Sequence, residues 1–348
     1  MKKLKEFNLK NKRVLVRCEF NVPLSSEGLI LDDFRIKETV PTIKYLIDKK
    51  AKVILISHLG RPGGKVVKKF SLRKVQKRLS CYLKKPVLGA NDCLGREVEK
   101  KVNDMKPGQV LLLENLRFYK GEEKNDSGFT KALAKLGDIY INDAFGASHR
   151  THASIVGIPK YLPSGIGLLM EEEINSLRRV IKNPKRPLVS IIGGAKVETK
   201  VRFINKISKI SDFVLLGGLI GEELKDKGIK IDYPKKVIGQ VEPFKGDFKY
   251  DIGPETVKIF KSKIKSAKTI LFNGVLGKAE EKRFARGTEE ILKAIVKGSA
   301  FSVVGGGEMA EFINKLGLSS KFGHISTGGG AMLAFLSGEK LPGIEALK

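Results

Sequence analysis

Short apolar runs alternate along this chain with longer stretches whose apolar positions recur at helical spacing. Helical spacing predicts helices over Ile36–Lys50, Leu72–Leu83 and Phe129–Leu136. In the first half, the strand-like runs are Arg13–Arg17, Lys52–Ser57, Pro86–Leu88, Gln109–Leu113 and Asp138–Asn142. Strands that alternate with helices predict an α/β unit with a parallel sheet.

The second half repeats this alternation. Its strand-like runs are Leu188–Ile192, Phe213–Leu216, Thr269–Phe272, Phe301–Val304 and His324–Thr327. Between the halves, Gly165–Ile181 has helical periodicity and lies between Pro163 and Pro184. We therefore expect two doubly wound α/β domains joined by a helix. The segment Leu219–Tyr250, rich in Lys, Gly and Pro, gives no clear assignment.

Polar residues follow the apolar runs of the first half. His58 and Arg61 follow one run, Arg117 follows the next, and Arg150 follows a third. Ligands of parallel sheets bind at the carboxyl ends of the strands, and the guanidinium fork suits phosphate and carboxylate. Arg35 opens a predicted helix, where a cation opposes the helix dipole and a functional reason is favoured. The first half is thus expected to hold a small polyanion by its side chains.

Glycines follow the apolar runs of the second half, namely Gly193–Gly194, Gly217–Gly218, Gly305–Gly307 and Gly328–Gly330. Such turns present backbone amides and helix ends to phosphates. Lys196 and Lys200 are predicted to share a face on the first turns of a helix, where phosphate neutralisation explains them better than stability. Glu308 starts another helix; it either holds Mg²⁺ or only stabilises the helix. Two phosphate-type ligands on two domains indicate a phosphotransferase.

Another motif raises the possibility of hydride transfer. Gly305–Ala310 fits G-x-G-x-x-[GA] after a strand, but a dinucleotide site also needs an acid about 20 residues further on. Ser326–Gly328 occupy that place, which disfavours NAD. The Walker A spacing is not matched at Gly193–Lys200 either.

Composition narrows the picture further. The chain has 348 residues, 41% of them hydrophobic and 30% charged, which fits about two globular domains. We expect no membrane span, no secretory signal and a cytoplasmic location, because no long apolar run occurs and the three cysteines are widely spaced. The net charge of +28 raises nucleic-acid binding as an alternative. The lysines are dispersed and aromatic residues make up only 7%, which favours surface charge that attracts small anions.

The motifs, taken in order, resemble those of the phosphoglycerate kinase family over nearly the whole chain. They are RCEFNVP, RIKETVPTIKYL, SHLGRP, LLENLRF, INDAFGASHR, GGAKVETK, FNGVLG…E…FARGT, VVGGGE, STGGGA and LPGIEAL. The resemblance implies reversible phosphoryl transfer between 1,3-bisphosphoglycerate and ADP, giving 3-phosphoglycerate and ATP, with Mg²⁺ required. It implies two Rossmann-like domains that close by a hinge, and a monomer. The expected parts are 1–163 for phosphoglycerate, 164–183 as the joining helix, 184–335 for nucleotide, and a tail, 336–348, that returns to the first domain.

The resemblance also assigns roles to individual residues. It implies catalytic roles for Arg35, Lys196 and Lys200. Phosphoglycerate would be bound by Glu19, Asn21, Arg35, His58, Arg61, Arg117 and Arg150. The nucleotide would be bound by Gly193, Gly194, Lys196, Lys200, Gly217, Gly218, Gly253, Asn273, Glu280, Gly306, Gly307, Glu308, Met309, Gly328 and Gly329, with Glu308 on the metal.

The chain departs from the family pattern in a few places. Glu19 stands where the family has Asp, Glu308-Met309 where it commonly has Asp-Thr or Asp-Ser, Leu219 where it has Gly, and Val275 where it has Pro. The segment Leu219–Tyr250 is also shorter than usual. Apart from Glu19, these changes gather at the predicted nucleotide and metal site. They motivate an alternative in which the chain is a non-catalytic phosphoglycerate-binding homologue with an impaired nucleotide site.

Overall fold

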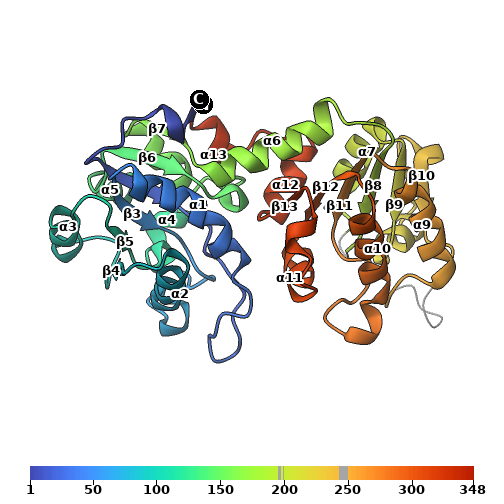
Figure 1. Cartoon of the computed structure of the whole chain (residues 1–348), viewed down its shortest axis with the longest axis horizontal. Coiled ribbons are helices and arrows are strands. Elements are labelled where there is room, and N and C mark those ends of the chain that lie inside the picture. Colours follow the sequence, from blue (N-terminus) through green and yellow to red (C-terminus); the bar gives the residue numbers. More distant parts are fainter. Residues whose placement is uncertain (195–196, 199, 243–249) are drawn as a thin grey trace. The chain divides into compact units, whose positions relative to one another are not determined.

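The computed structural model describes residues 1–194, 197–198, 200–242 and 250–348 (Figure 1). The chain folds into two compact units. Unit 1 comprises Met1–Glu172 with Lys340–Lys348, and unit 2 comprises Glu173–Glu339. The division between the units falls within helix α6 (Leu168–Lys182).

Unit 1 is built on a seven-stranded sheet with the order β1-β7-β6-β2-β3-β5-β4, and its strand pairings are parallel. The strands are β1 (Lys2–Lys3), β2 (Arg13–Arg17), β3 (Lys52–Ile56), β4 (Val87–Gly89), β5 (Val110–Leu112), β6 (Ile139–Asn142) and β7 (Ser164–Ile166). The helices are α1 (Phe34–Asp48), α2 (Arg73–Leu83), α3 (Arg96–Asn103), α4 (Lys120–Glu123), α5 (Ser127–Ala134) and α13 (Pro342–Glu345). Short 3₁₀ helices include η3 (Leu116–Phe118) and η4 (Phe145–Ala147), and η5 (Ala153–Gly157) is a π-helical turn.

Unit 2 is built on a six-stranded parallel sheet with the order β10-β9-β8-β11-β12-β13. The strands are β8 (Leu188–Ile192), β9 (Phe213–Leu216), β10 (Val237–Gly239), β11 (Thr269–Asn273), β12 (Phe301–Gly305) and β13 (His324–Ser326). The helices are α7 (Val201–Ile210), α8 (Leu219–Asp226), α9 (Pro254–Ser266), α10 (Arg286–Lys297), α11 (Gly307–Lys315) and α12 (Gly329–Leu336). Helix α9 packs against α10, and α7 packs against α12.

The order of strands fixes where a ligand can bind in each unit. In unit 2, the chain leaves β8 toward β9 but leaves β11 in the opposite direction, toward β12. In unit 1, β2 has β3 on one side and β6 on the other. Connections that depart to opposite sides open a crevice at the carboxyl ends of the two central strands. The crevices are therefore expected at β8 and β11 in unit 2, and at β2 and β6 in unit 1.

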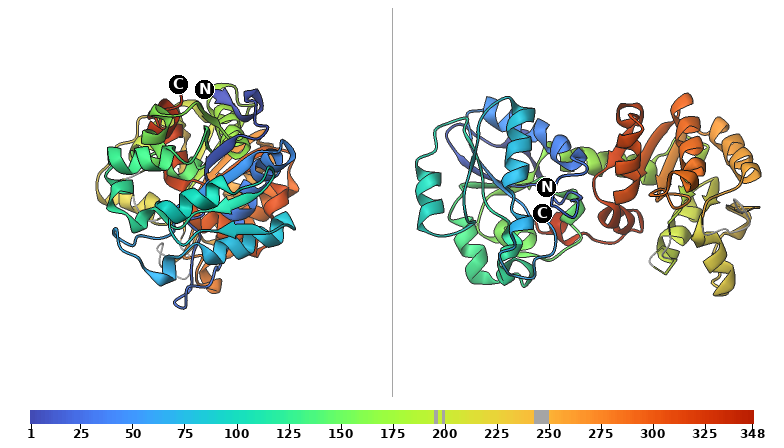
Figure 2. Two further views of the ribbon diagram at one scale, coloured as in Figure 1. Left: turned by 90° about the vertical axis from the view of Figure 1, so that its left-hand side faces the viewer. Right: turned by 90° about the horizontal axis from the view of Figure 1, so that it is seen from below.

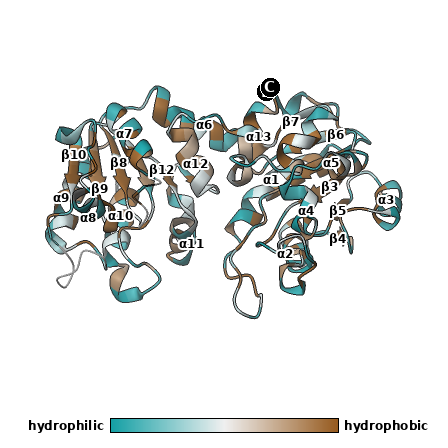
Figure 3. Cartoon of the chain, turned by 180° about the vertical axis from the view of Figure 1, so that it is seen from behind, coloured by the Kyte–Doolittle hydropathy of each residue, from teal (hydrophilic) through white to brown (hydrophobic). Residues whose placement is uncertain are grey.

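Both sheets are apolar because helices and loops cover their two faces. Figure 3 shows the strands in the colours of hydrophobic residues, while hydrophilic residues gather on the helices. In β2, for example, Val14, Leu15 and Val16 are all fully buried, although successive side chains point to opposite faces. This is why the strands read as continuous apolar runs.

The C-terminal segment packs on unit 1, as the fold prediction required. The N–H of Gly343 donates to the carbonyl of Ser148 at 2.9 Å, and Asn142 Nδ2 donates to the Gly343 carbonyl at 3.4 Å. The two ends of the chain lie close together in unit 1 (Figure 2). The predicted fold class, two parallel-sheet α/β domains with a returning tail, is confirmed.

Candidate functional site

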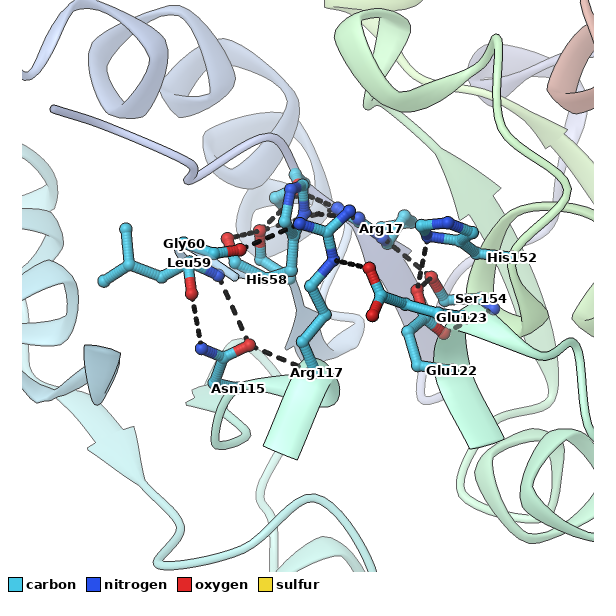
Figure 4. Close-up of polar contacts among 12 residues, drawn as sticks. Arg17, His58, Leu59, Gly60, Asn115, Arg117, Glu122, Glu123, His152 and Ser154 are labelled. Atoms are coloured by element: carbon cyan, nitrogen blue, oxygen red, sulfur yellow. Dashed lines mark hydrogen bonds and ion pairs between the residues drawn. The ribbon is translucent and has the colours of Figure 1, made fainter. Parts of the chain in front are cut away.

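The carboxyl ends of four neighbouring strands of unit 1 gather the predicted phosphoglycerate residues. A chain of hydrogen bonds links three of these ends, and Figure 4 shows the link between Gly60 and Arg117. The N–H of Gly60, after β3, donates to Asn21 Oδ1 at 2.9 Å, and Arg117 Nη1, after β5, donates to the Gly60 carbonyl at 2.8 Å. Arg35, on the first turn of α1, donates to the Asn21 carbonyl. These contacts bring Asn21, Arg35 and Arg117 to one place.

Arg117 is a buried cation of this group, and one of its donors is not used within the described part of the chain. Its side chain is buried, and Nη2 has no hydrogen-bond partner among the described residues. Its Nε lies 3.3 Å from Glu123 Oε1, an ion pair without hydrogen-bond alignment. Burial lowers the pKa of Arg117, and the nearby Arg150 lowers it further. A buried cation with an unused donor is stabilised by an anion that accepts from it.

The other predicted residues of unit 1 differ in exposure. Glu19 and His58 are buried, Asn21, Arg35 and Arg150 are half-buried, and Arg61 is exposed. Arg150 lies close enough to Arg117 and His58 to lower the pKa of both. The set therefore combines buried groups, of which His58 and Arg117 are held by hydrogen bonds, with more exposed arginines able to meet an incoming anion.

These residues adjoin a buried polar layer that the sequence pattern did not predict. Arg17 is fully buried at the end of β2, and its Nη2 lies 2.9 Å from His58 Nδ1. Its Nε donates to Ser154 Oγ at 2.9 Å, and Ser154 Oγ donates to the buried Glu122 at 2.6 Å. The one signal for this layer in the sequence was an arginine at the end of a strand that is buried on both faces. Glu122 lies in the charged run GEEKND, which reads as solvated surface.

In unit 2, the loops after β8 and β11 carry the predicted glycines to the crevice. Gly194 adopts φ +98° and Gly274 adopts φ +79°, which glycine tolerates best. A Cβ at Gly193 would lie 2.2 Å from the Val275 carbonyl oxygen, so these two turns pack backbone against backbone. The N–H groups of Gly193 and Gly274 donate to the carbonyls of Asn273 and Gly305 at 2.9 and 3.1 Å, so backbone contacts hold the two turns in place.

Lys200 lies at the centre of these turns. It is the residue before α7, its side chain is buried, and its Nζ donates to the Gly193 carbonyl. Burial lowers the pKa of Lys200 to about 8, while the carboxylate of Glu308 acts in the opposite direction. The sequence placed both lysines within the first turns of a helix, but α7 begins only at Val201. Lys196 lies outside the described residues.

Two helix N-termini meet beside Lys200. Gly306 precedes α11 and Gly328 precedes α12. A Cβ at Gly329 would lie 3.3 Å from Gly306 Cα and 3.5 Å from the Gly307 nitrogen, so the two helix starts are in contact. Unpaired N–H groups and the positive end of each dipole make such a junction favourable for phosphate.

A cavity of about 210 Å³ opens next to these turns. Its lining consists of Gly194, Gly218, Leu219, Val275, Gly277, Lys278, Glu280 and Glu308. Leu219 and Val275, two positions where the chain departs from the resembled pattern, therefore border the predicted nucleotide site. The sequence assigned no role to Gly277 and Lys278, although Lys278 is exposed and adds a cation.

Some predicted nucleotide residues contribute differently from what the sequence implied. The Met309 side chain is fully buried, so only its backbone could meet a ligand. Asn273 is buried, and its Nδ2 lies 3.3 Å from the Gly305 carbonyl. Gly253 precedes α9 and packs against Glu242, since a Cβ there would lie 2.6 Å from Glu242 Oε1. Gly217 packs against Leu276. These four residues are not among those that line the cavity.

Glu308 is the carboxylate available for a metal. It is exposed on the first turn of α11 and borders the cavity. Within the described ranges, no group of three or more His, Cys, Asp and Glu residues is arranged to hold a metal. Mg²⁺ commonly takes one or two carboxylates and completes its shell with water and substrate phosphates. The donor set therefore fits a Mg²⁺ ion that arrives with a nucleotide, and does not fit an all-protein metal cage.

Comparisons with known proteins give the same family from end to end. A family model described as phosphoglycerate kinase matches residues 4–237 and 230–339. Phosphoglycerate kinases of Dictyoglomus turgidum and Moorella thermoacetica are 46% and 42% identical, each over 99% of this chain and 98% of the relative. The crystal structure of phosphoglycerate kinase from Pyrococcus horikoshii OT3 superposes with a TM-score of 0.90 at 33% identity, over 100% of this chain and 98% of that one.

The shortened segment also shows in these comparisons. The two stretches of the family match meet at residues 230–237, within the segment Leu219–Tyr250. The alignment with the Dictyoglomus relative extends over 388 positions, against 348 residues in this chain. A deletion in this segment produces a match that breaks there. The structure forms α8 and β10 across it, which the sequence left unassigned. With matches of this extent and identity, the chain belongs to the phosphoglycerate kinase family and is a phosphotransferase.

Proposed function

We propose that the strand ends of unit 1 bind 3-phosphoglycerate and that the glycine turns of unit 2 bind ADP or ATP. The observation that carries this assignment is the buried Arg117, whose Nη2 has no partner in the described part of the chain. Arg35, Arg61 and Arg150 complete the anion site, and Asn21 and Glu19 supply polar groups for the remaining oxygens. Guanidinium groups suit both the carboxylate and the phosphate of this substrate.

On unit 2, the nucleotide phosphates meet the α11 and α12 N-termini and Lys200. The described glycines let the phosphates approach the backbone closely, and Lys200 supplies a buried positive charge. Glu308 holds the Mg²⁺, which supplies charge neutralisation to the phosphates when bound. Glu280 and the apolar residues Leu219 and Val275 border the cavity that takes the nucleoside part. Lys196, predicted to share this work, lies outside the described residues.

Phosphoryl transfer needs positioning and neutralisation of charge more than it needs an acid and a base. The carboxylate of 3-phosphoglycerate is already a nucleophile. Arg35 and Lys200 stabilise the charge on the phosphoryl group as it moves between the carboxylate and ADP. Because the two ligands belong to different units, transfer occurs only when the units bring them together, and this closure excludes water.

Both sites come from one chain, so a monomer suffices for the proposed reaction. Cys18, Cys81 and Cys93 are free, which fits the proposed cytoplasmic location. No helix in the described part of the chain is both long and apolar enough to cross a membrane.

The test is ATP consumption by the purified protein, with 3-phosphoglycerate and Mg²⁺ each present or omitted. A coupled dehydrogenase traps the bisphosphoglycerate. We expect turnover only when all three components are present. Absence of turnover in protein shown to be folded would refute the assignment.

A further inference from the structure

Arg17 is a fully buried cation that cannot reach a ligand, yet it contacts His58, which the proposed function places in the phosphoglycerate site. Its side chain is buried at the end of β2, and its donors contact His58 and Ser154 (Figure 4). Nη1 donates to the Cys18 carbonyl, Nε donates to Ser154 Oγ at 2.9 Å, and Nη2 lies 2.9 Å from His58 Nδ1. Any role of Arg17 in the reaction must therefore act through the residues it holds.

The contact between Arg17 and His58 determines which ring nitrogen carries the proton. A guanidinium group has N–H donors and no acceptor. His58 Nδ1 must then accept the hydrogen bond from Arg17, which requires a free lone pair on Nδ1. A neutral imidazole with an unprotonated Nδ1 carries its hydrogen on Nε2. The hydrogen is placed here by the chemistry of the partner, and no other tautomer satisfies both groups.

The surroundings of His58 also disfavour its charged form. His58 is buried, and the groups that act on it are Arg17 from β2, Arg117 from η3, Arg150 after η4 and His152 before η5. Burial is the largest cause, and each of these four neighbours adds to it, so the pKa of His58 lies well below its usual value. His58 therefore stays neutral across the range in which an ordinary histidine titrates.

Arg17 is itself held in place by a buried acid. Ser154 Oγ accepts from Arg17 Nε and donates to Glu122 Oε1 at 2.6 Å, while the Ser154 N–H donates to Glu122 Oε2 at 2.9 Å. The Tyr140 hydroxyl donates to the Ser154 carbonyl at 2.6 Å. The network fixes the guanidinium from behind and gives the buried cation a counter-charge through one hydroxyl.

We propose that Arg17 is a positioning residue that holds neutral His58 as the Nε2–H tautomer, so that His58 offers phosphoglycerate a permanent hydrogen-bond donor. His58 then acts as neither acid nor base, and ligand binding moves no proton at this residue. The group it meets on the ligand must be an acceptor, a carboxylate or phosphate oxygen. The tautomer is inferred from the contact between Arg17 and His58, whereas the ligand that His58 binds rests on the proposed function.

Nitrogen-15 NMR of the imidazole rings tests the tautomer directly. The chain has four histidines, so each ring can be assigned. In the wild-type protein, we expect His58 to show a protonated Nε2, an unprotonated Nδ1 and no titration from about pH 5 to pH 8. A protonated Nδ1, or an ordinary titration of His58, would overturn the proposal. This measurement needs neither a variant nor a ligand.

Variants then separate the action of Arg17 from a general effect on β2. In Arg17→Met, we expect His58 to show both tautomers or to titrate, and the KM for 3-phosphoglycerate to become pH-dependent. Arg13→Met is the matched control, because Arg13 lies on the same strand and pairs with Asp138 at the protein surface. A folded Arg17→Met protein whose His58 spectrum is unchanged would contradict the positioning role.

The donor role is tested at His58 itself. His58→Gln keeps an N–H donor without a titrating ring and should raise the KM for 3-phosphoglycerate by less than about 10-fold, whereas His58→Met should raise it by roughly 100-fold. If the wild-type tautomer is as described but His58→Met binds 3-phosphoglycerate normally, the donor role is wrong. Turnover that is normal in all of these proteins would contradict the donor role and leave the kinase assignment intact.

Discussion

Lys200→Met should make the protein more stable and nearly inactive. The Lys200 ammonium group is buried and donates a hydrogen bond to the Gly193 carbonyl. Burial lowers the pKa of Lys200 from 10.5 to about 8, which corresponds to about 3 kcal/mol of destabilisation of the charged form. Bound phosphate groups can offset this destabilisation, whereas the protein without ligand cannot offset it.

The sign of the effect depends on pH. The folded state releases the Lys200 proton more readily than the unfolded state, so the destabilisation is complete below about pH 8 and disappears as the pH approaches 10.5. Methionine removes the buried charge but also the hydrogen bond to Gly193, which contributes about 1.5–3 kcal/mol for a charged donor. We therefore expect the free energy of unfolding at pH 7 to rise by up to about 1.5 kcal/mol, with the gain shrinking above pH 8.

The effect of Lys200→Met on activity should be much larger than its effect on stability. Removing one preorganised charge or donor from a transition state costs about 100- to 1000-fold in rate. Urea denaturation at pH 7 and at about pH 9.5, together with the coupled assay, measures both effects. Lys209→Met, on the exposed surface of the same helix, is the control. A variant that is several kcal/mol less stable, or that keeps turnover within about 10-fold of wild type, would refute the reasoning.

Further predictions concern both units. The kcat/KM for the nucleotide should fall above about pH 8 as Lys200 deprotonates. The kcat should fall only at higher pH, because bound phosphates raise the pKa of Lys200. A pH–rate profile measures both effects. Arg117→Met should raise the KM for 3-phosphoglycerate by roughly 100-fold in steady-state kinetics, because a charge-assisted pair is lost. Glu308→Gln should raise the Mg²⁺ concentration for half-maximal rate by about 10-fold, measured by metal titration. Thr327→Val should lower the free energy of unfolding by about 1–3 kcal/mol in urea, because it removes the hydroxyl that donates to the buried Glu173 at 2.7 Å.

The long apolar strands could be predicted from the sequence almost to the residue. β2, β8 and β9 have the expected limits, because a parallel strand covered on both faces gives an unbroken apolar run. β7 (Ser164–Ile166) was missed because Gly165 and Ile166 were included in the helix predicted over Gly165–Ile181, whereas α6 begins only at Leu168. β10 was missed because it lies in the segment shortened relative to the family.

Some of the site residues could likewise be predicted from the sequence, and others could not. Side chains directly after a predicted strand, such as His58 and Arg117, could be found because the strand fixes their position. Arg17 and Glu122 could not, since their partners are far apart in the sequence and become neighbours only when β2 and η5 pack together. The start of α7 was misplaced because Lys196 and Lys200 fit a helical face, whereas the helix begins after the turn that buries Lys200.

Separate binding of the two ligands to the two units is the central claim, and isothermal titration tests it most directly. 3-Phosphoglycerate and Mg-ADP are each titrated into the wild-type protein, Arg117→Met and Lys200→Met. We predict that wild type binds both ligands, that Arg117→Met loses only 3-phosphoglycerate, and that Lys200→Met weakens only Mg-ADP. Loss of 3-phosphoglycerate binding in Lys200→Met, or of Mg-ADP binding in Arg117→Met, would contradict the account.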